Sequence, residues 1–239
     1  MPKLNLALVL HSHQPVGNFD FVIEDAFITC YKPVIDVFDD HPDIKVSLHF
    51  SGCLLEWIEA HHPDYFDKLR AGVLRGQYEM IGGAMYEPIL TMLPERDRAG
   101  QLGMMRDYIE SRFYKAPAGM WLAERIWEQA LVTSISSSGY NACCLDDSHF
   151  KNAGFADYDL TGGFIAEDQG NALRVFPGSE KLRYMIPFHY VDEIINYLRS
   201  EAVNTGTKTI VYADDGEKFG VWPGTNQLCF KDGWLKTFL

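Results

Sequence analysis

Short apolar runs alternate with segments of helical periodicity along almost the whole chain, and this alternation constrains the fold more than any other feature. Seven runs are predicted to form strands, at residues 4–10, 44–50, 77–81, 120–123, 141–145, 172–176 and 209–213. Helices are predicted between them, at residues 23–38, 54–74, 95–113, 127–138 and 191–200. Crossover connections of this length make neighbouring strands parallel, which leads to a doubly wound sheet or a closed barrel. Because the seven strands are nearly continuous in apolar residues, we expect a barrel of parallel strands, a (β/α)7 fold of the α/β class.

The size and charge of the chain narrow the choice of partners. With 239 residues, 47% of them hydrophobic, the chain is long enough for one domain that spans residues 1–239. The formal net charge of −12 argues against nucleic acid and anionic membranes, because both require a basic surface. We therefore expect a neutral or cationic ligand, with no nucleic acid and no membrane as partners.

The cysteines and the N-terminal residues predict where in the cell the protein is located. The five cysteines are odd in number and show neither a disulfide framework nor zinc-ligand spacing. The apolar run at residues 6–10 has neither a charged leader nor a cleavage site, so it does not match a signal peptide. A cytoplasmic location is expected.

Two histidines end the first predicted strand. His11 and His13 are two residues apart, so their side chains point to the same side of the strand. Two imidazoles that face one cavity can bind a metal ion or hydrogen-bond to a polar substrate, and the alternative is that both are structural.

Carboxylates accompany several other strands. Glu124 follows the run 120–123, at the carboxyl end of a predicted parallel strand, where catalytic groups gather in barrels; a solvated turn is the alternative. Glu79 lies within an apolar pattern, where a carboxylate is either hydrogen-bonded, functional or on an exposed face. Asp146 and Asp147 are interpreted as the N-cap and acidic first turn of a helix.

The last predicted strand ends in an acidic cluster. Asp214, Asp215 and Glu217 lie within four residues, and their mutual repulsion raises the pKa of at least one carboxyl group, as a general acid near neutral pH requires. Gly216 also permits a charged, solvated turn. Trp222 can offer its ring face to a sugar or anchor the core.

Two segments stand apart from the repeat. The polar, Gly-rich segment 154–170 is expected to be a long loop on the active side of the barrel. Residues 231–239 are expected to open a helix whose apolar side chains, including Trp234 and Leu235, have no evident partner. From this we expect a catalytic domain truncated at its C-terminal end, weakly active or inactive alone, and able to form homo-oligomers.

Five motifs, in order, carry a family resemblance. They are HSHQPVGNF (11–19), HFSG (49–52), GQYEMIGGAMYEPIL (76–90), WLAERIWE (121–128) and DDGEKFGVWPGT (214–225). Together they resemble the motifs of glycoside hydrolase family 57, in its 4-α-glucanotransferase and α-amylase branch. The resemblance covers almost the whole chain, and it implies a seven-stranded (β/α) barrel with retaining chemistry on α-glucans or maltooligosaccharides.

The resemblance also implies roles for individual residues. Glu124, the carboxylate of the W-x-A-E motif, would be the nucleophile, and Asp215, the first carboxylate of D-x-E, would be the general acid/base. Further residues would hold sugars around the reacting bond: His11, His13, Glu79, Trp121, Glu217, Lys218 and Trp222. No metal and no cofactor is implied, because protonation and covalent capture supply what a Lewis acid would.

Two other functions are alternatives to this one. A metal-dependent hydrolase of the amidohydrolase kind would use His11 and His13 as ligands, completed by His49, His149 or Asp215, but it leaves the carboxylates at the other strand ends without roles. A non-catalytic carbohydrate-binding module would need neither proposed catalytic carboxylate, and both are present.

Overall fold

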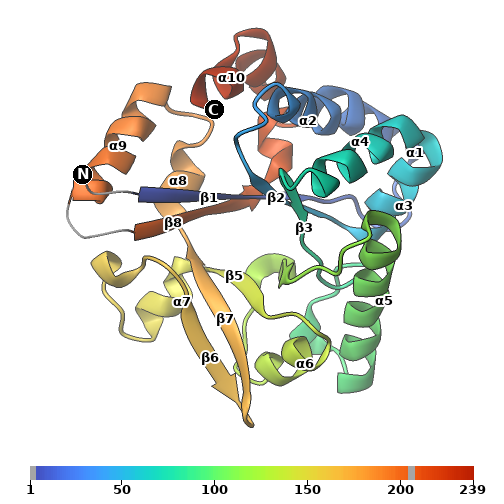
Figure 1. Ribbon diagram of the computed structural model, residues 1–239, viewed down its shortest axis with the longest axis vertical. Helices are drawn as coiled ribbons and strands as arrows, with labels where there is room; N and C mark the ends of the chain where they lie inside the picture. Colours follow the sequence, from blue (N-terminus) through green and yellow to red (C-terminus); the bar gives the residue numbers. More distant parts are fainter. Residues whose placement is uncertain (1–3, 204–207) are drawn as a thin grey trace.

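The computed structural model describes residues 4–203 and 208–239, and its centre is a barrel of seven parallel strands (Figure 1). The strands are β1 (Leu4–Ser12), β2 (Val46–Phe50), β3 (Tyr78–Met80), β4 (Gly119–Met120), β5 (Ala142–Asp146), β7 (Asn171–Gly178) and β8 (Lys208–Asp215). They follow the order β3-β2-β1-β8-β7-β5-β4. The predicted (β/α)7 barrel is confirmed. Each of the seven predicted strands has a counterpart, although the run at residues 120–123 overlaps β4 only at Met120.

The number of paired residues between neighbouring strands varies around the barrel. Strands β1 and β8 pair along their whole length, from Leu4 with Lys208 to His11 with Asp215. Between β7 and β8 a single register pair, Gly178 with Val211, is found among the described residues. Figure 1 shows these two strands diverging on one side of their contact. The seam between β7 and β8 is therefore held by little backbone hydrogen bonding.

The ring closes between β3 and β4 through Gly82. Its N–H donates to the Gly119 carbonyl at 2.9 Å, and its own carbonyl accepts from Trp121 N–H at 2.8 Å. A Cβ at Gly82 would lie 2.4 Å from the hydroxyl oxygen of Tyr140. The close approach that seals the barrel here therefore requires glycine.

Helices surround the barrel (Figure 1). They are α1 (Asp20–Ala26), α2 (Lys32–Asp39), α3 (Gly52–His61), α4 (Pro63–Leu74), α5 (Glu95–Phe113), α6 (Leu131–Ser137), α7 (Asp147–Asn152), α8 (Glu180–Met185), α9 (Val191–Val203) and α10 (Trp234–Phe238). The predicted helix at residues 54–74 is divided into α3 and α4, because Pro63 begins a new helix and forces the preceding His62 out of the helical region. No helix in the described part of the chain is long and apolar enough to cross a membrane.

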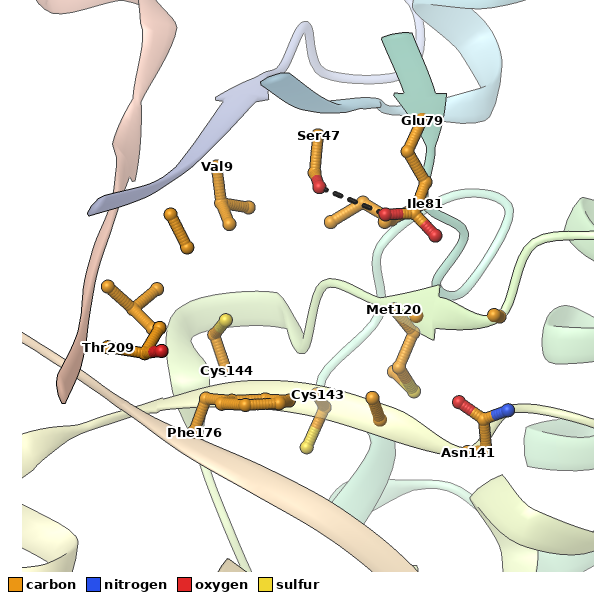
Figure 2. Close-up of a pocket in the computed structure, with 15 residues that line it drawn as sticks. Val9, Ser47, Glu79, Ile81, Met120, Asn141, Cys143, Cys144, Phe176 and Thr209 are labelled. Carbon is orange, nitrogen blue, oxygen red and sulfur yellow. Dashed lines mark hydrogen bonds between the residues drawn. The ribbon is translucent and has the colours of Figure 1, made fainter. Parts of the chain in front are cut away.

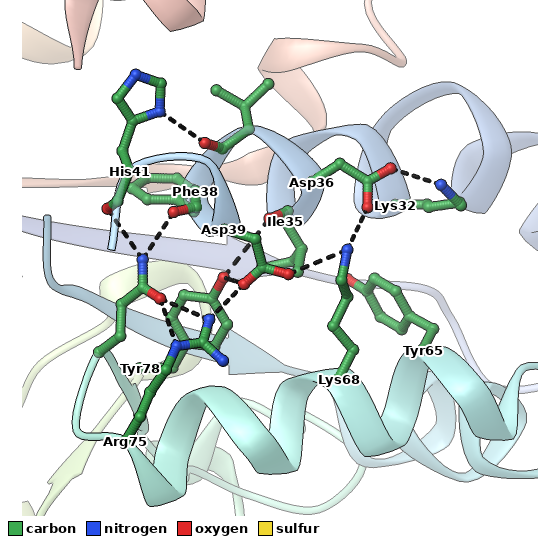
Figure 3. A network of polar contacts seen from close by, with 12 residues as sticks. Lys32, Ile35, Asp36, Phe38, Asp39, His41, Tyr65, Lys68, Arg75 and Tyr78 are labelled. Atoms are coloured by element: carbon green, nitrogen blue, oxygen red, sulfur yellow. Dashed lines mark hydrogen bonds and ion pairs between the residues drawn. The ribbon is translucent and has the colours of Figure 1, made fainter. Parts of the chain in front are cut away.

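A polar network fixes α2 against α4 on the outside of the barrel (Figure 3). Lys68 of α4 contacts Asp36 at 2.6 Å and Asp39 at 3.0 Å, and Arg75 also pairs with Asp39. These groups are about one-third exposed, so each pair contributes at most about 1 kcal/mol. The network orients the helices and lies outside the barrel interior.

The segment 154–170 is not the long loop that was expected. It contains a 3-10 turn, Asp157–Asp159, and a strand, β6 (Phe164–Asp168), which pairs antiparallel with β7. The turn of this hairpin consists of Gln169 and Gly170, both with positive φ (51° and 80°), as a two-residue hairpin loop demands. The hairpin turn precedes β7 and lies at its amino end, away from the carboxyl ends of the strands.

The C-terminal helix also differs from expectation, because its apolar side chains have partners. Trp234 and Leu235 are buried and belong to the main core cluster. The Trp234 Nε1–H donates to the carbonyl of His189 at 2.8 Å, and its ring stacks on Phe238. The expected exposed apolar face of residues 231–239 is therefore largely covered.

Candidate active site

A pocket of about 350 Å³ opens at the carboxyl ends of the strands. It is lined by His11, His13, Glu87, Ala123, Glu124, Asp215, Glu217 and Trp222. Strand register explains why residues far apart in sequence meet here. His11 pairs with His49 on one side and with Asp215 on the other, so the ends of β2, β1 and β8 lie side by side.

Glu124 follows β4 in a tight 3-10 turn, Ala123–Arg125, and its side chain reaches the pocket. Both Glu124 and Arg125 have a φ of 52°, in the left-handed region that residues other than glycine seldom adopt. Such a conformation costs about 1–3 kcal/mol per residue and persists only where surrounding contacts enforce it. The surroundings therefore hold Glu124 at the pocket against its local preference.

Asp215 and Asp214 end β8 and point in opposite directions, as the strand period requires. Asp215 lines the pocket, whereas Asp214 is fully buried behind it. Burial and the neighbouring Asp214 raise the pKa of Asp215, while Arg125, Lys218 and Arg183 act in the opposite direction. A carboxyl group with a raised pKa retains its proton more readily, which suits a general acid.

Alternating charges connect the residues behind the two catalytic candidates. Arg183 Nη1 donates to Asp146 Oδ1 at 2.8 Å, and Arg125 Nε lies 2.8 Å from the same oxygen in an ion pair. Arg183 also donates through Nε to Asp214 Oδ1 at 3.2 Å, and Lys218 Nζ binds the other oxygen of Asp214. This series of ion pairs, from Arg125 through Asp146, Arg183 and Asp214 to Lys218, links the ends of β4, β5, β7 and β8.

Asp146 therefore differs from the predicted helix cap. It occupies the N-cap position of α7, but its side chain makes no capping hydrogen bond. Its carboxylate is committed to the two arginines instead, because a charged hydrogen bond to guanidinium is stronger than one to a backbone N–H. Asp147 pairs with Lys151 at 3.1 Å within the same helix, as an acidic first-turn residue can.

Glu217 lies on the side of the pocket nearest β1. Its Oε1 accepts from the Tyr31 hydroxyl at 2.6 Å and from the His13 backbone N–H at 2.8 Å. Burial raises the pKa of Glu217 to about 7 despite these hydrogen bonds. The side chain is therefore partly protonated near neutral pH.

A group of imidazoles and one carboxylate form the floor of the pocket. His13 Nδ1 contacts Glu87 Oε2, and this hydrogen bond raises the pKa of His13. His11 Nδ1 lies 2.8 Å from His49 Nδ1. Burial lowers the pKa of His49 to about 4. Burial also lowers the pKa of His11 well below its usual value, and the nearby His49, His13 and Arg125 lower it further. At neutral pH the deeper two imidazoles are neutral, whereas the contact with Glu87 shifts His13 toward its protonated form.

Comparison with known proteins identifies the family. A family model described as "Glycosyl hydrolase family 57" matches residues 7–239. The chain belongs to glycosyl hydrolase family 57. It is 48% identical over 237 residues to "Alpha-amylase 1" of Dictyoglomus thermophilum, covering 99% of this chain and 34% of that protein. It is 44% identical over 238 residues to "4-alpha-glucanotransferase" of Thermococcus litoralis, covering 100% of this chain and 36% of that protein.

Solved structures agree with this assignment. The crystal structure of the 4-alpha-glucanotransferase from Thermococcus litoralis superposes with a TM-score of 0.97 at 43% identity, covering all of this chain and 37% of that one. A branching enzyme of the same family from Pyrococcus horikoshii has a TM-score of 0.76 at 14% identity, a likeness of fold. The chain spans about a third of the length of the curated relatives it matches. The family resemblance noted from the five motifs is confirmed.

Among the residues that the family 57 motifs suggested for sugar binding, Trp222 and Trp121 are placed differently. Trp222 is 41% exposed at the pocket, with Lys218 Nζ 5.3 Å from its ring centre and Phe188 stacked beside it at 6.0 Å. Trp121 is buried, and its ring stacks on His11 with centroids 4.4 Å apart. Trp222 can meet a sugar ring, whereas Trp121 supports the imidazole.

Lys218 lies beneath the pocket surface. It is 6% exposed, and its ammonium group contacts Asp214 and the Arg183 carbonyl. Its charge therefore acts mainly on Asp214 and, through space, on Asp215.

Glu79 lies apart from the other predicted site residues. Figure 2 shows it in a separate cavity of about 260 Å³ inside the barrel, where its Oε2 accepts from the Ser47 hydroxyl at 3.2 Å. This cavity is lined mainly by the first halves of the strands, and Glu79 is not among the residues that line the pocket of Glu124 and Asp215. The sugar contact that the family resemblance implies for Glu79 stays a prediction, and the alternative is a structural role in this cavity.

Several site residues escaped the sequence analysis. Glu87 belongs to a quoted motif but carries no catalytic pattern, and Arg183 and Tyr31 lie in segments predicted as helix or connection. His149, offered as a ligand in the amidohydrolase alternative, contacts the Arg125 carbonyl at 2.9 Å and does not line the pocket. Of the three groups offered to complete that ligand set, His149 is therefore absent from the pocket, whereas His49 and Asp215 lie beside His11.

Proposed function

We propose that this chain carries the active site of a retaining enzyme that acts on α-glucans, of 4-α-glucanotransferase or α-amylase type. The observation that supports it best is the shared pocket of Glu124 and Asp215, which come from opposite sides of the barrel and differ in environment. Glu124 is exposed at the mouth, while Asp215 is partly buried beside Asp214. Two carboxyl groups in unlike environments can divide the roles of nucleophile and acid.

In the first step, Glu124 attacks the anomeric carbon of the bound glucan, and Asp215 donates its proton to the departing glycosidic oxygen. The bond between carbon and leaving oxygen breaks as the ester bond to Glu124 forms, through an oxocarbenium-like transition state. The raised pKa of Asp215 keeps a larger fraction of this group protonated and ready to donate.

In the second step, the roles of Asp215 reverse. Its carboxylate removes a proton from the acceptor as that acceptor attacks the anomeric carbon and releases Glu124. Water as acceptor gives hydrolysis, and a glucan hydroxyl gives transglycosylation. Two inversions at one carbon retain the α configuration.

The remaining polar groups of the pocket hold the sugar in this scheme. The side chains of His13 and Glu217, which are linked through the His13 backbone N–H, offer hydrogen bonds to hydroxyl groups, and Trp222 offers a ring face. His11 contributes from the floor, oriented by Trp121 and His49. Lys218 forms an ion pair with Asp214, and its positive charge lowers the pKa of Asp215. We place the reaction in the cytoplasm, since all five cysteines are free.

Incubation with pure maltooligosaccharides, followed by separation of the products, tests this function. Transfer produces chains both longer and shorter than the substrate, and hydrolysis produces only shorter chains. The variant Glu124→Gln serves as the matched control and should produce neither. A wild-type chain that leaves the oligosaccharides intact would contradict the proposal.

A further inference from the structure

We propose that His11, His13 and Glu87 form a binding site for a divalent transition-metal ion, Zn²⁺ in particular, and that an ion bound there blocks the carbohydrate pocket. The site consists of one ring nitrogen from each histidine and one carboxylate oxygen, all within 4.8 Å of one another. Zinc binds nitrogen and carboxylate ligands at about 2.0–2.2 Å, so two ligands of one ion lie about 3.4 Å apart in a tetrahedral site. Shifts of about 1 Å or less bring these three atoms to that geometry.

The donor atoms are only partly satisfied by the protein. Glu87 Oε1 is buried without a hydrogen-bond partner, and it lies 3.6 Å from His11 Nδ1 and 3.5 Å from His49 Nδ1. The Glu87 side chain is 7% exposed, so bulk water does not solvate this oxygen freely. His13 Nδ1 is also buried, and it contacts Glu87 Oε2. A cation would satisfy these atoms together, which no donor among the described residues does.

The charge of the pocket favours a cation. Glu124, Asp215 and Glu217 line the same pocket as Glu87, so four carboxyl groups surround two imidazoles. Arg125 and Lys218 lie behind this layer and are engaged by Asp146 and Asp214. The pocket therefore attracts positive ions more strongly than the net charge of −12 alone would.

The donor set selects the kind of ion. Two imidazole nitrogens and one carboxylate favour Zn²⁺, Cu²⁺ and Ni²⁺, whereas Ca²⁺ and Mg²⁺ prefer oxygen ligands. His49, fully buried, lies against His11 and restrains the orientation of its ring, and Trp121 stacks on the same ring. Neighbours that orient a ligand in this way raise metal affinity. His13, whose side chain is 39% exposed, provides the route of entry.

Inhibition follows if the proposed function holds, because His11 and His13 are the groups proposed to contact the sugar. An ion held between them and Glu87 would compete with the glucan for the same space. The binding of zinc itself does not depend on that function.

The binding test uses the metal-stripped chain titrated with Zn²⁺ in competition with a chromogenic zinc chelator. We expect one tight site per chain in the wild type and at least a 10-fold weaker affinity in Glu87→Gln and in His13→Asn. Glu24→Gln is a matched control, because Glu24 pairs with His62 at 2.8 Å in a contact that lacks a second histidine ligand. Cys53→Ser is a second control, since Cys53 is the free cysteine that is not buried. Both controls should bind zinc as the wild type does.

Thermal unfolding provides a second readout and shows that each variant folds. Zinc should raise the unfolding midpoint of the wild type and of both controls, and it should leave that of Glu87→Gln and His13→Asn unchanged, because only binding to the folded state stabilises it. His13 is partly exposed, so His13→Asn remains informative if Glu87→Gln does not fold.

Equal zinc affinity in the wild type and in His13→Asn, a loss of the site in either control, or no binding by the wild type would overturn the proposal. With maltooligosaccharides as substrate, zinc should raise the apparent KM, and a chelator should reverse the effect. If the wild type binds zinc through these residues but has no action on glucans, the proposed function fails while the metal site stands.

Discussion

Arg183 and Asp214 form an ion pair, with Nε 3.2 Å from Oδ1, across the seam where β7 and β8 share a single register pair among the described residues. The other side of the Arg183 guanidinium binds Asp146, which also binds Arg125. Since Glu124 precedes Arg125 and Asp215 follows Asp214, this bridge lies directly behind both proposed catalytic groups. We infer that Arg183 is a positioning residue that sets the separation of Glu124 from Asp215.

The variant Arg183→Gln should lower kcat by about 10- to 100-fold, because an error of about 1 Å between reacting groups costs up to about 100-fold in rate. The effect on KM should be smaller. Arg183 acts to lower the pKa of Asp215, so its removal should raise that pKa and keep the general acid protonated to higher pH. The alkaline limb of the pH profile of kcat/KM should therefore move to higher pH.

Arg112→Gln is the control for this variant. Arg112 pairs with Glu59 at 3.1 Å, and neither residue lines the pocket. Its loss should leave both kcat and the pH profile unchanged. If Arg183→Gln lowers only the unfolding temperature and leaves the pH profile in place, Arg183 is structural and positions nothing.

Glu124→Gln and Asp215→Asn should each lower turnover by at least about 1,000-fold without unfolding the protein, because volume is kept and only the ionisable function is removed. Azide should restore part of the activity of a Glu124→Ala variant with an activated glycoside, since it can replace the missing nucleophile. Circular dichroism establishes folding, and initial rates establish the loss. Near wild-type rates in either variant would remove that residue from its role.

Glu217 makes stability depend on pH. Its pKa is about 7 in the folded chain and 4.5 ordinarily, so between these values the unfolded chain has released a proton that the folded chain retains. The unfolded state then binds fewer protons, and the free energy of unfolding falls as pH rises from about 4.5 through 7. The variant Glu217→Gln lacks this ionisable group. Its free energy of unfolding, relative to that of the wild type, should therefore increase by up to about 3 kcal/mol between pH 4.5 and pH 8. Urea unfolding at both pH values measures the difference, and parallel curves would show that Glu217 is not perturbed.

Trp222 and Glu79 give opposite expectations, although the family motifs suggested sugar contacts for both. Trp222 is exposed at the pocket, so Trp222→Ala should raise KM for maltooligosaccharides by about 2- to 10-fold through loss of stacking. Glu79 lies in the separate interior cavity with Ser47, so Glu79→Gln should leave KM unchanged. A KM raised as much by Glu79→Gln as by Trp222→Ala would show that the interior cavity takes part in binding.

Local patterns in the sequence predicted the seven strands and the strand ends of the site. The two-residue period correctly places His11 and His13 in one pocket, because a strand fixes which side each residue faces. Strand β6 was missed because the Gly-rich composition of its surroundings hid a short alternation, in which Phe164 and Ala166 pack inward while Ile165 and Glu167 are exposed.

Contacts across the fold could not be predicted in the same way. Arg183 meets Asp146 and Asp214, residues 37 and 31 positions away, and nothing in its own short helix marks it as part of a site. Asp146 matches a helix cap in the sequence, because the arginines that compete for its carboxylate are visible only in three dimensions. Glu87 approaches the histidines from a turn where its φ is 52°. The local sequence does not predict this conformation.

Labelling with a fluorinated α-glucosyl fluoride that forms a long-lived glycosyl-enzyme tests the central claim most directly. Proteolysis and mass spectrometry would locate the attached sugar. The retaining mechanism proposed here predicts one sugar per chain on the peptide that contains Glu124, and none in Glu124→Gln. A sugar attached to Glu87, Glu217 or Asp215, or turnover by the wild type without any covalent label, would contradict the assignment of Glu124 as the nucleophile.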